Sequence, residues 1–571
     1  MKVRFTQLLP YLLCTLVAIP GLRTGFVLDD WVHRGLISGA FTHASPWNLF
    51  SFAPGDPERF WRLVENGPFP WFSLPELKIA FFRPLSSALV QLDVALFGDA
   101  PFPAHLHSLA WGLLLVAAAQ RLYRKTIPGL AVVAIVLFAI DRSHALPMAW
   151  LANRNSVVAT ALAAWGLVGH LSWREGGRRS GLVLAVLAWT AALCSAEAAI
   201  GALAYVPAYE LFGRDGDWKT RARALMPAGL VGLAFVITYR LAGAGAWGGA
   251  TYIDPIREPT VYLANAPARL LAIAGAWSSG IPADLWLTRP EARPVLIGLG
   301  AVALIGWPLL WRWLNLEGEP EARAVRWLAL GAALGVLPFL AIFPADRLLI
   351  SSSLGLAPLA ALVLRAAWRA RRWLVLGWLS VALSLATSIG WFVTPGVMIG
   401  WRDAVTRAAL QPKGLDTLSG KRLVIIDCSD FAVGMYSSIA MAAMRRPLPA
   451  AWMLLSPAMA AHRVYRLDER RFEVEIVDGR ILDTVFEQNV RADRFPLRVG
   501  DVVKLKTLTV TVRATDRDKP TRFEVALDEP PSSYTFIRWN GDVFEPVTLP
   551  EPGQVLELPK TSDVAQRLLG G

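Results

Sequence analysis

The chain has 571 residues, of which 54% are hydrophobic and 18% are charged, and its mean hydropathy is +0.41. A soluble protein with so few charges would struggle to cover its surface, so the composition argues against an ordinary soluble globular protein. The net charge of +12 does not indicate nucleic-acid binding, because the basic residues form short clusters between apolar segments and no continuous basic face.

Uncharged apolar runs such as 131–140 and 374–392 predict membrane-spanning helices, in which every backbone polar group is satisfied within the segment. Lys2 and Arg4 precede the first run and place the N-terminus in the cytoplasm by the positive-inside rule. No small-x-small cleavage site follows that run, so we predict an uncleaved first helix. The sparse cysteines and the lack of an organelle address favour a bacterial inner membrane.

We therefore predict a polytopic α-helical membrane protein with about eleven transmembrane helices over residues 1–400 and a large first external loop at residues 23–78. Prolines and charges interrupt the stretch from Val261 to Arg293, for which we predict an in-plane or re-entrant helix pair. Residues 413–460 predict a small α/β segment.

Residues 461–571 alternate apolar and polar side chains over several short runs, with turn signals such as Asp478-Gly479 between them. This pattern predicts an antiparallel β-rich module in the periplasm, which could bind a glycan or the acceptor, or only brace the membrane domain. Asp427 to Asp430 follow a predicted strand and precede a predicted helix, where an anion could bind. Ordinary N-capping by Ser429 or Asp430 is the favoured interpretation.

Three cysteines, Cys14, Cys194 and Cys428, are far apart and predict neither a disulfide framework nor a zinc site. The sharpest polar feature is Asp29-Asp30, a few residues after the first apolar run. Two adjacent carboxylates suit a general base or a ligand pair for Mg²⁺ or Mn²⁺, although no complete oxygen shell is visible. The alternative is an N-cap pair that begins the next helix.

Four further residues lie near predicted external membrane faces. Arg154 could grip phosphate with its planar guanidinium, or its side chain could simply extend to the lipid headgroups, and His144 lies close by in the sequence. Glu197 is a single acid at a hairpin tip, where a charge is costly unless it is paired or functional. Arg347 directly precedes another predicted span.

The order of these pieces along the chain resembles a known family. Asp29-Asp30 is followed by FRPLSSALVQLDVALFG, HLHSL, HALPMAWLANRN, the Glu197 hairpin and PADRLLISSSLG. Over residues 1–395 this resembles the GT-C superfamily of membrane glycosyltransferases. The likeness is greatest to the protein O-mannosyltransferase-like branch, which includes the transmembrane and tetratricopeptide-containing mannosyltransferases.

The resemblance implies inverting transfer of a sugar, mannose or another hexose, from a polyprenyl-phosphate-linked donor to an unidentified acceptor on the non-cytoplasmic face. It implies that Asp29 and Asp30 are the catalytic acids and that Arg83, Arg154 and Arg347 contact the donor phosphate. Glu197 matches the hairpin acid, and His144 lies in the Arg154 segment.

The chain departs from the family pattern at several places. Ala196 stands where the hairpin lysine is expected, Asn153 replaces the glycine before Arg154, and the Arg347 segment lacks the expected tyrosines. The β-rich module stands in place of a tetratricopeptide array. These departures leave phosphate binding and the acceptor open.

Two other functions stay open at this stage. A lipid or polysaccharide transporter would place ionisable residues at mid-membrane and show paired halves, and the sequence shows neither pattern. A non-catalytic scaffold with a glycan- or protein-binding β domain would have no use for reactive carboxylates at Asp29 and Asp30.

Overall fold

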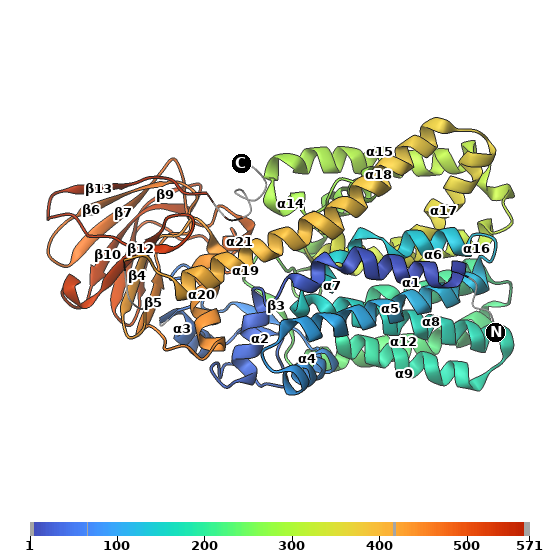
Figure 1. Ribbon diagram of the computed structural model, residues 1–571, viewed down its shortest axis with the longest axis horizontal. Coiled ribbons are helices and arrows are strands. Elements are labelled where there is room, and N and C mark those ends of the chain that lie inside the picture. Colours follow the sequence, from blue (N-terminus) through green and yellow to red (C-terminus); the bar gives the residue numbers. More distant parts are fainter. Residues whose placement is uncertain (1–4, 66, 415–417, 563, 565–571) are drawn as a thin grey trace. The chain divides into compact units, whose positions relative to one another are not determined.

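The computed structural model describes residues 5–65, 67–414, 418–562 and 564, so Lys2 and Arg4 lie outside the described residues (Figure 1). The chain divides into two compact units. The helical unit comprises Met1–Gly25, Phe81–Ala244 and Asp254–Gly396, and the sheet unit comprises Phe26–Ala80, Gly245–Ile253 and Val397–Gly571. The domain limits predicted at residues 400, 413 and 461 stay predictions.

The helical unit consists of helices, and the chain leaves it for the sheet unit at residues 26–80 and 245–253. Its helices are α1 (Phe5–Ala18), α4 (Pro84–Phe97), α5 (Pro101–Thr126), α6 (Ala131–Ala139), α7 (Ala145–Ala149), α8 (Arg154–Gly176), α9 (Arg179–Ser195), α10 (Ala199–Ala202), α11 (Tyr205–Ala208), α12 (Trp218–Leu241), α13 (Pro259–Ser279), α14 (Leu285–Thr288), α15 (Arg293–Trp313), α16 (Ala322–Val336), α17 (Ser353–Arg369) and α18 (Trp373–Ser388). Helix α19 (Thr394–Leu410) continues from α18 and leads into the sheet unit.

Among the described residues, six helical stretches are long and apolar enough to cross a membrane, or seven if the bent pair Ala131–Ala139 and Arg142–Ala149 is one span. Only 17% of the apolar window in α12, and the same share in α15, is buried within the protein. Apolar side chains left exposed on so large a scale require a lipid environment. The chain is an integral membrane protein, and the total of about eleven spans stays a prediction.

Small residues let neighbouring helices approach closely, as is typical of membrane helix packing. Figure 1 shows α5, α8 and α9 side by side, and α8 meets α9 where Gly169 and Gly181 each face the other's backbone. Helix α13 meets α15 in the same way at Gly275 and Gly300.

The stretch after Val261 forms helices of unequal length, and its in-plane or re-entrant placement stays a prediction. Helix α13 is continuous over Pro259–Ser279 and contains Pro267, and the four-residue α14 and a 3₁₀ turn at Pro290–Ala292 follow it. A proline removes a single backbone hydrogen bond, and packing along α15 keeps the helix intact around it.

The sheet unit contains three sheets. Their strands are β1 (Ser51–Pro54), β2 (Lys78–Ala80), β3 (Gly245–Trp247), β4 (Arg422–Asp427), β5 (Ala451–Leu454), β6 (Ala461–Arg466), β7 (Arg471–Val477), β8 (Val502–Lys504), β9 (Leu508–Asp516), β10 (Lys519–Leu527), β11 (Thr535–Trp539), β12 (Phe544–Pro546) and β13 (Val555–Leu558). Its helices are α2 (Asp29–Ile37), α3 (Pro57–Glu65), α20 (Phe431–Ala443) and α21 (Val485–Gln488).

The largest sheet has the order β13-β6-β7-β10-β9-β8, and all its pairings are antiparallel, as the alternating sequence predicts. In β7, Phe472, Val474 and Ile476 are buried and the residues between them are not, so one face of the sheet is the core side. The predicted strands and helix of the α/β segment, β4, α20 and β5, are confirmed.

Strand β11 does not join the antiparallel sheet. It pairs parallel with β4, in the order β12-β11-β4-β5, so a strand from the predicted β-rich module completes the α/β segment. Its buried Phe536 and Ile537 are surrounded by protein on both faces, which suits a central parallel strand.

The segment Phe26–Ala80 folds together with the C-terminal part of the chain. Strand β2 pairs with β1 on one side and with β3, from residues 245–247, on the other, which makes a three-stranded sheet. Trp71 donates its Nε1–H to the Leu455 carbonyl at 2.9 Å, and its ring lies 5.3 Å from that of Phe523. Arg491 donates to the Phe72 carbonyl at 2.7 Å, so side chains from both parts fix the loop.

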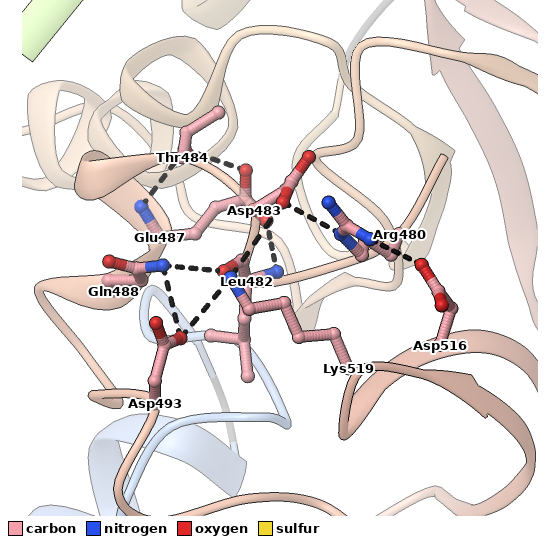
Figure 2. Close-up of polar contacts among 9 residues, drawn as sticks. All are labelled: Arg480, Leu482, Asp483, Thr484, Glu487, Gln488, Asp493, Asp516 and Lys519. Carbon is pink, nitrogen blue, oxygen red and sulfur yellow. Dashed lines mark hydrogen bonds and ion pairs between the residues drawn. The ribbon is translucent and has the colours of Figure 1, made fainter. Parts of the chain in front are cut away.

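Polar contacts around α21 hold another junction of the sheet unit in place (Figure 2). Thr484 caps this helix and also donates its hydroxyl to buried Glu487 at 2.7 Å. Lys519 of β10 lies 3.2 Å from Asp493 and 3.7 Å from Asp483. Burial raises the pKa of Glu487 to about 7, and its hydrogen bonds oppose that rise. Each of these polar side chains has its partner within the sheet unit, so the cluster connects α21 and its flanking residues to β10.

The close approach of α13 and α15 gives a stability prediction. A Cβ at Gly300 would lie 1.9 Å from the Leu271 carbonyl oxygen, whereas a Cβ at Gly298 on the same helix would meet nothing within 4 Å. We expect Gly300→Ala to lower the unfolding free energy by ~1–3 kcal/mol because the helices must separate. Gly298→Ala should not lower stability, because its Cβ meets open space and alanine favours a helix over glycine. Thermal unfolding of the purified protein in detergent measures both variants. Equal melting temperatures for the two variants would contradict this helix contact.

Candidate functional site

The two adjacent carboxylates of the first loop have different surroundings. Both begin α2, and Asp30 is buried with 3% exposure. The backbone N–H of Val27 donates to Asp30 Oδ2 at 2.8 Å across a tight turn in which Leu28 has a φ of 48°. A left-handed leucine is strained, and this hydrogen bond helps to hold the turn. Asp30 therefore shapes the chain at the start of α2.

Asp29 is half-buried and accepts a hydrogen bond from the hydroxyl of Tyr436. Tyr436 lies on α20, which packs against α2 within the sheet unit. Burial is the main cause that raises the pKa of Tyr436 well above its ordinary value, and the Asp29 carboxylate is the second. The phenol therefore stays protonated and acts as a hydrogen-bond donor. A carboxylate that is partly accessible and fixed on one side is suited to accept a proton from a hydroxyl group.

Positive charge lies one turn along α2. Arg34 stacks on the ring of Phe26, with its guanidinium 4.3 Å from the ring centre. The pKa of Arg34 is lowered, mainly by burial; Asp30 opposes this shift and Arg445 adds to it. Among the described residues, no group of three or more His, Cys, Asp or Glu side chains is placed to hold a metal. The aspartate pair alone would supply few of the oxygen ligands that Mg²⁺ or Mn²⁺ takes. A role for either cation stays a prediction.

In the helical unit, Arg83 and Glu197 form an ion pair with each other. Arg83 Nε donates to Glu197 Oε2 at 2.9 Å, Nη2 donates to Oε1, and the guanidinium also lies 4.5 Å from the Phe81 ring. The side chains retain only 14% and 27% exposure. In this bidentate contact each charge is neutralised by the other, so neither needs a bound ligand. The pairing explains how a charged glutamate is tolerated at a hairpin tip.

Arg154 is also paired internally. Its side chain is 3% exposed, and Nη1 lies 2.5 Å from Asp93 of α4. The other oxygen of Asp93 lies 2.6 Å from His107 Nδ1, and Trp111 donates to His107 Nε2 at 3.0 Å. The chain Trp111, His107, Asp93, Arg154 therefore connects α4, α5 and α8 through one carboxylate.

His144 and Arg347 lie in different surroundings. His144 is buried, with Nε2 3.1 Å from Ser353 Oγ and its ring against Phe138, which is a packing environment. Arg347 is half-buried, and its guanidinium lies 5.6 Å from the Phe343 ring. Within the part of the chain that the structure describes, no carboxylate pairs with Arg347, whereas neighbouring Asp346 pairs with Arg142 at 3.1 Å.

Sequence reasoning missed Asp93, Tyr436 and Arg142. Asp93 is the one charged residue within the apolar helix α4, and that rarity is a signal the sequence offered. Arg142 donates to the Ala276 carbonyl at 2.8 Å and to the Ile281 carbonyl at 3.0 Å around the end of α13. The sequence held no signal for Tyr436, because its partner lies in a remote segment.

A second polar cluster lies where the parallel strands β4, β5 and β11 end. His462 Nδ1 lies 3.6 Å from Asp427 Oδ1, Arg538 Nη2 lies 3.8 Å from Oδ2, and Ser456 Oγ lies 2.7 Å from His462 Nε2. Asp427, Ser456 and His462 are fully buried. Burial raises the pKa of Asp427 to about 8, opposed by Arg538, and lowers the pKa of His462 to about 4.

At the same strand end, the predicted N-cap is confirmed. Asp430 accepts from Val433 N at 3.0 Å and so caps α20. Its second oxygen accepts from Val564 N at 3.0 Å, and Ser429 Oγ lies 2.6 Å from Thr561 Oγ1. These contacts occupy the helix N-terminus with protein groups.

Comparison with known proteins gave few likenesses. No protein-family model matches the chain, and no curated protein does so. The crystal structure of ArnT from Cupriavidus metallidurans bound to undecaprenyl phosphate is 14% identical, with a TM-score of 0.41 over 77% of this chain and 85% of ArnT. The apo structure of ArnT is 14% identical, with a TM-score of 0.42 over 77% and 84%. Likenesses this low carry no conclusion about function.

The Asp427 cluster predicts a pH dependence of stability. Folded Asp427 keeps its proton up to about pH 8 while the unfolded carboxyl loses it near 3.8, so stability falls as pH rises between these values. Folded His462 stays neutral down to about pH 4, whereas the unfolded imidazole has the ordinary pKa of 6.5. Between pH 4 and 6.5 the His462 contribution to stability therefore rises with pH and cancels the fall caused by Asp427. Net stability should therefore fall from pH 6.5 to 8, by at most ~1.4 kcal/mol per pH unit.

Asp427→Asn removes the titrating carboxyl and should abolish the fall from pH 7 to 8, which lies above the pKa of about 7 for Glu487, as measured by chemical denaturation of the full chain in detergent. Asp468→Asn is the matched control. The pKa of exposed Asp468 is held below its ordinary value by hydrogen bonds from Arg470 and Arg471, so it is ionised throughout this range. If Asp427→Asn and the wild type show parallel profiles from pH 6.5 to 8, Asp427 does not titrate there.

Proposed function

We propose that the chain is an integral membrane glycosyltransferase that moves a sugar, mannose or another hexose, from a polyprenyl-phosphate-linked donor to an acceptor on the non-cytoplasmic face. The observation that carries the proposal is the Asp29 carboxylate, which is half-buried at the N-terminus of α2 and fixed by Tyr436. It follows the first apolar helix closely in a protein whose other long helices suit a lipid environment. A base in this part of the chain serves a reaction outside the bilayer core.

The proposed chemistry is a single displacement. The acceptor hydroxyl loses its proton to Asp29 as its oxygen forms a bond to the anomeric carbon, and polyprenyl phosphate leaves with the electron pair of the breaking C–O bond. A guanidinium near the leaving phosphate would stabilise the developing charge. Asp30, whose carboxylate is committed to the Val27 backbone, would keep Asp29 in place.

Among the arginines considered for the donor phosphate, Arg347 is the best candidate. Arg83 and Arg154 already have carboxylate partners, whereas Arg347 lies against the face of Phe343. A guanidinium with no internal carboxylate partner can form a bidentate contact with phosphate without first breaking an ion pair. We place the protein in a bacterial inner membrane, with the N-terminus in the cytoplasm and the sheet unit in the periplasm.

One observation favours a second function. The Arg83–Glu197 and Arg154–Asp93 pairs satisfy two of the three expected phosphate ligands internally, which is what a non-catalytic scaffold would retain. A scaffold needs no reactive carboxylate, so substitution of Asp29 separates the two functions.

We expect Asp29→Asn to lower kcat for transfer or hydrolysis of a polyprenyl-phosphate sugar by about 10²–10⁴-fold, because the amide cannot accept the proton. Asp30→Asn should instead lower thermal stability, since it weakens the turn before α2. The assay uses purified protein in lipid and a panel of polyprenyl-phosphate sugars. Full activity of Asp29→Asn in a folded protein would rule out Asp29 as the base, and no turnover of any donor by the wild type would favour the scaffold.

For donor binding, Arg347→Gln should raise KM for the lipid-linked sugar about tenfold or more, because one charge-assisted contact to phosphate is lost. Arg293→Gln is the control, since Arg293 is also half-buried and lies 5.3 Å from an aromatic ring, that of Trp286. Equal KM values for the two variants would remove Arg347 from the donor site.

A further inference from the structure

Tyr436 and Asp29 come from opposite ends of the sequence, and both belong to the sheet unit. Three separate segments of that unit meet at Tyr436. Helix α2 supplies Asp29, α20 supplies Tyr436, and the segment 245–253 supplies Tyr252, which acts electrostatically on Tyr436. The C-terminal part of the chain therefore determines the surroundings of a carboxylate in the first external loop.

The contact is selective for one of the two acids. Asp30 is turned back to the Val27 backbone, and Asp29 receives the phenol. Among the described residues, Asp30 on α2 and Tyr252 on 245–253 also act electrostatically on Tyr436, and Arg34 on α2 interacts with Asp30 and with Arg445 just after α20. A hydroxyl that donates to one carboxylate oxygen limits rotation of the group and favours its ionised form.

We infer that Tyr436 is a positioning residue for Asp29, which orients its carboxylate and favours the anion, so that the C-terminal part of the chain sets the reactivity of the acidic pair. The consequence of this contact for sugar transfer rests on the function proposed above. The effect of Tyr436 on Asp29 itself does not depend on that function. Tyr436 keeps its proton throughout the reaction, because the pKa of its phenol lies well above the ordinary value. The acceptor proton passes to Asp29.

The first test measures the ionisation of Asp29 without any sugar. Carbodiimide modifies protonated carboxyl groups, and peptide mass spectrometry of the full-length protein in lipid reports modification of Asp29 as a function of pH. Without the phenol donor, the midpoint for Asp29 should rise by about one to two pH units in Tyr436→Phe. Replacement of Tyr436 by 3-fluorotyrosine, a stronger donor that keeps the ring, should move the midpoint down.

Tyr465→Phe is the matched control, because Tyr465 also donates to a carboxylate, Glu475 at 2.6 Å, on the antiparallel sheet. It should leave the Asp29 midpoint at the wild-type value. An unchanged midpoint in Tyr436→Phe, or one that Tyr465→Phe shifts equally, overturns the inference. The fluorotyrosine protein keeps the test decisive if Tyr436→Phe does not fold, since an unchanged midpoint there has the same meaning.

The second test connects the contact to catalysis. With an active donor, Tyr436→Phe should lower kcat about tenfold, leave KM for the donor unchanged and move the acidic limb of the kcat profile to higher pH with the labelling midpoint. A labelling shift without sugar transfer by the wild type leaves the positioning of Asp29 intact and rejects the transferase. A labelling shift with an unchanged kcat profile overturns the claim that Tyr436 sets reactivity.

Discussion

The cost of leaving a charge without water or a partner governs this molecule. A buried carboxylate or guanidinium loses its hydration and is tolerated when hydrogen bonds or an opposite charge replace it. Asp93 of α4 joins Arg154 of α8 and His107 of α5, Arg83 joins Glu197, and Asp346 joins Arg142. These ion pairs add directional contacts between segments of the helical unit, in which helices such as α12 and α15 have apolar outer surfaces.

The same constraint explains why equal residues acquire different roles. Asp29 and Asp30 are adjacent and chemically identical, yet Asp30 accepts a hydrogen bond from the backbone of the preceding turn. Asp29 stays half-buried and receives a side-chain donor from α20. Among the arginines, Arg83 and Arg154 are internally neutralised, while Arg347 rests on an aromatic face. Burial and partner choice therefore separate structural charges from those suited to chemistry.

The sheet unit shows how separate segments of a chain can make one domain. The segment Phe26–Ala80, the short segment 245–253 and the C-terminal part share strands and core aromatics, including Trp71 against Phe523. Loop closure entropy grows slowly with length, so pairing distant segments costs little more than pairing near ones. One consequence is that α20 reaches the acidic pair of a loop near the other end of the sequence.

Local patterns in the sequence were enough for the class of the protein and most of its elements. Apolar runs predict the membrane helices because lipid accepts no unpaired backbone groups, and alternation predicts strands such as β7 because a sheet has two faces. The Asp29-Asp30 pair was visible as adjacent charges. Tertiary structure decided what local patterns cannot encode: that β11 pairs with β4, that Arg154 meets Asp93, and that Tyr436 meets Asp29. These contacts join residues far apart in the chain, and packing of whole elements selects them.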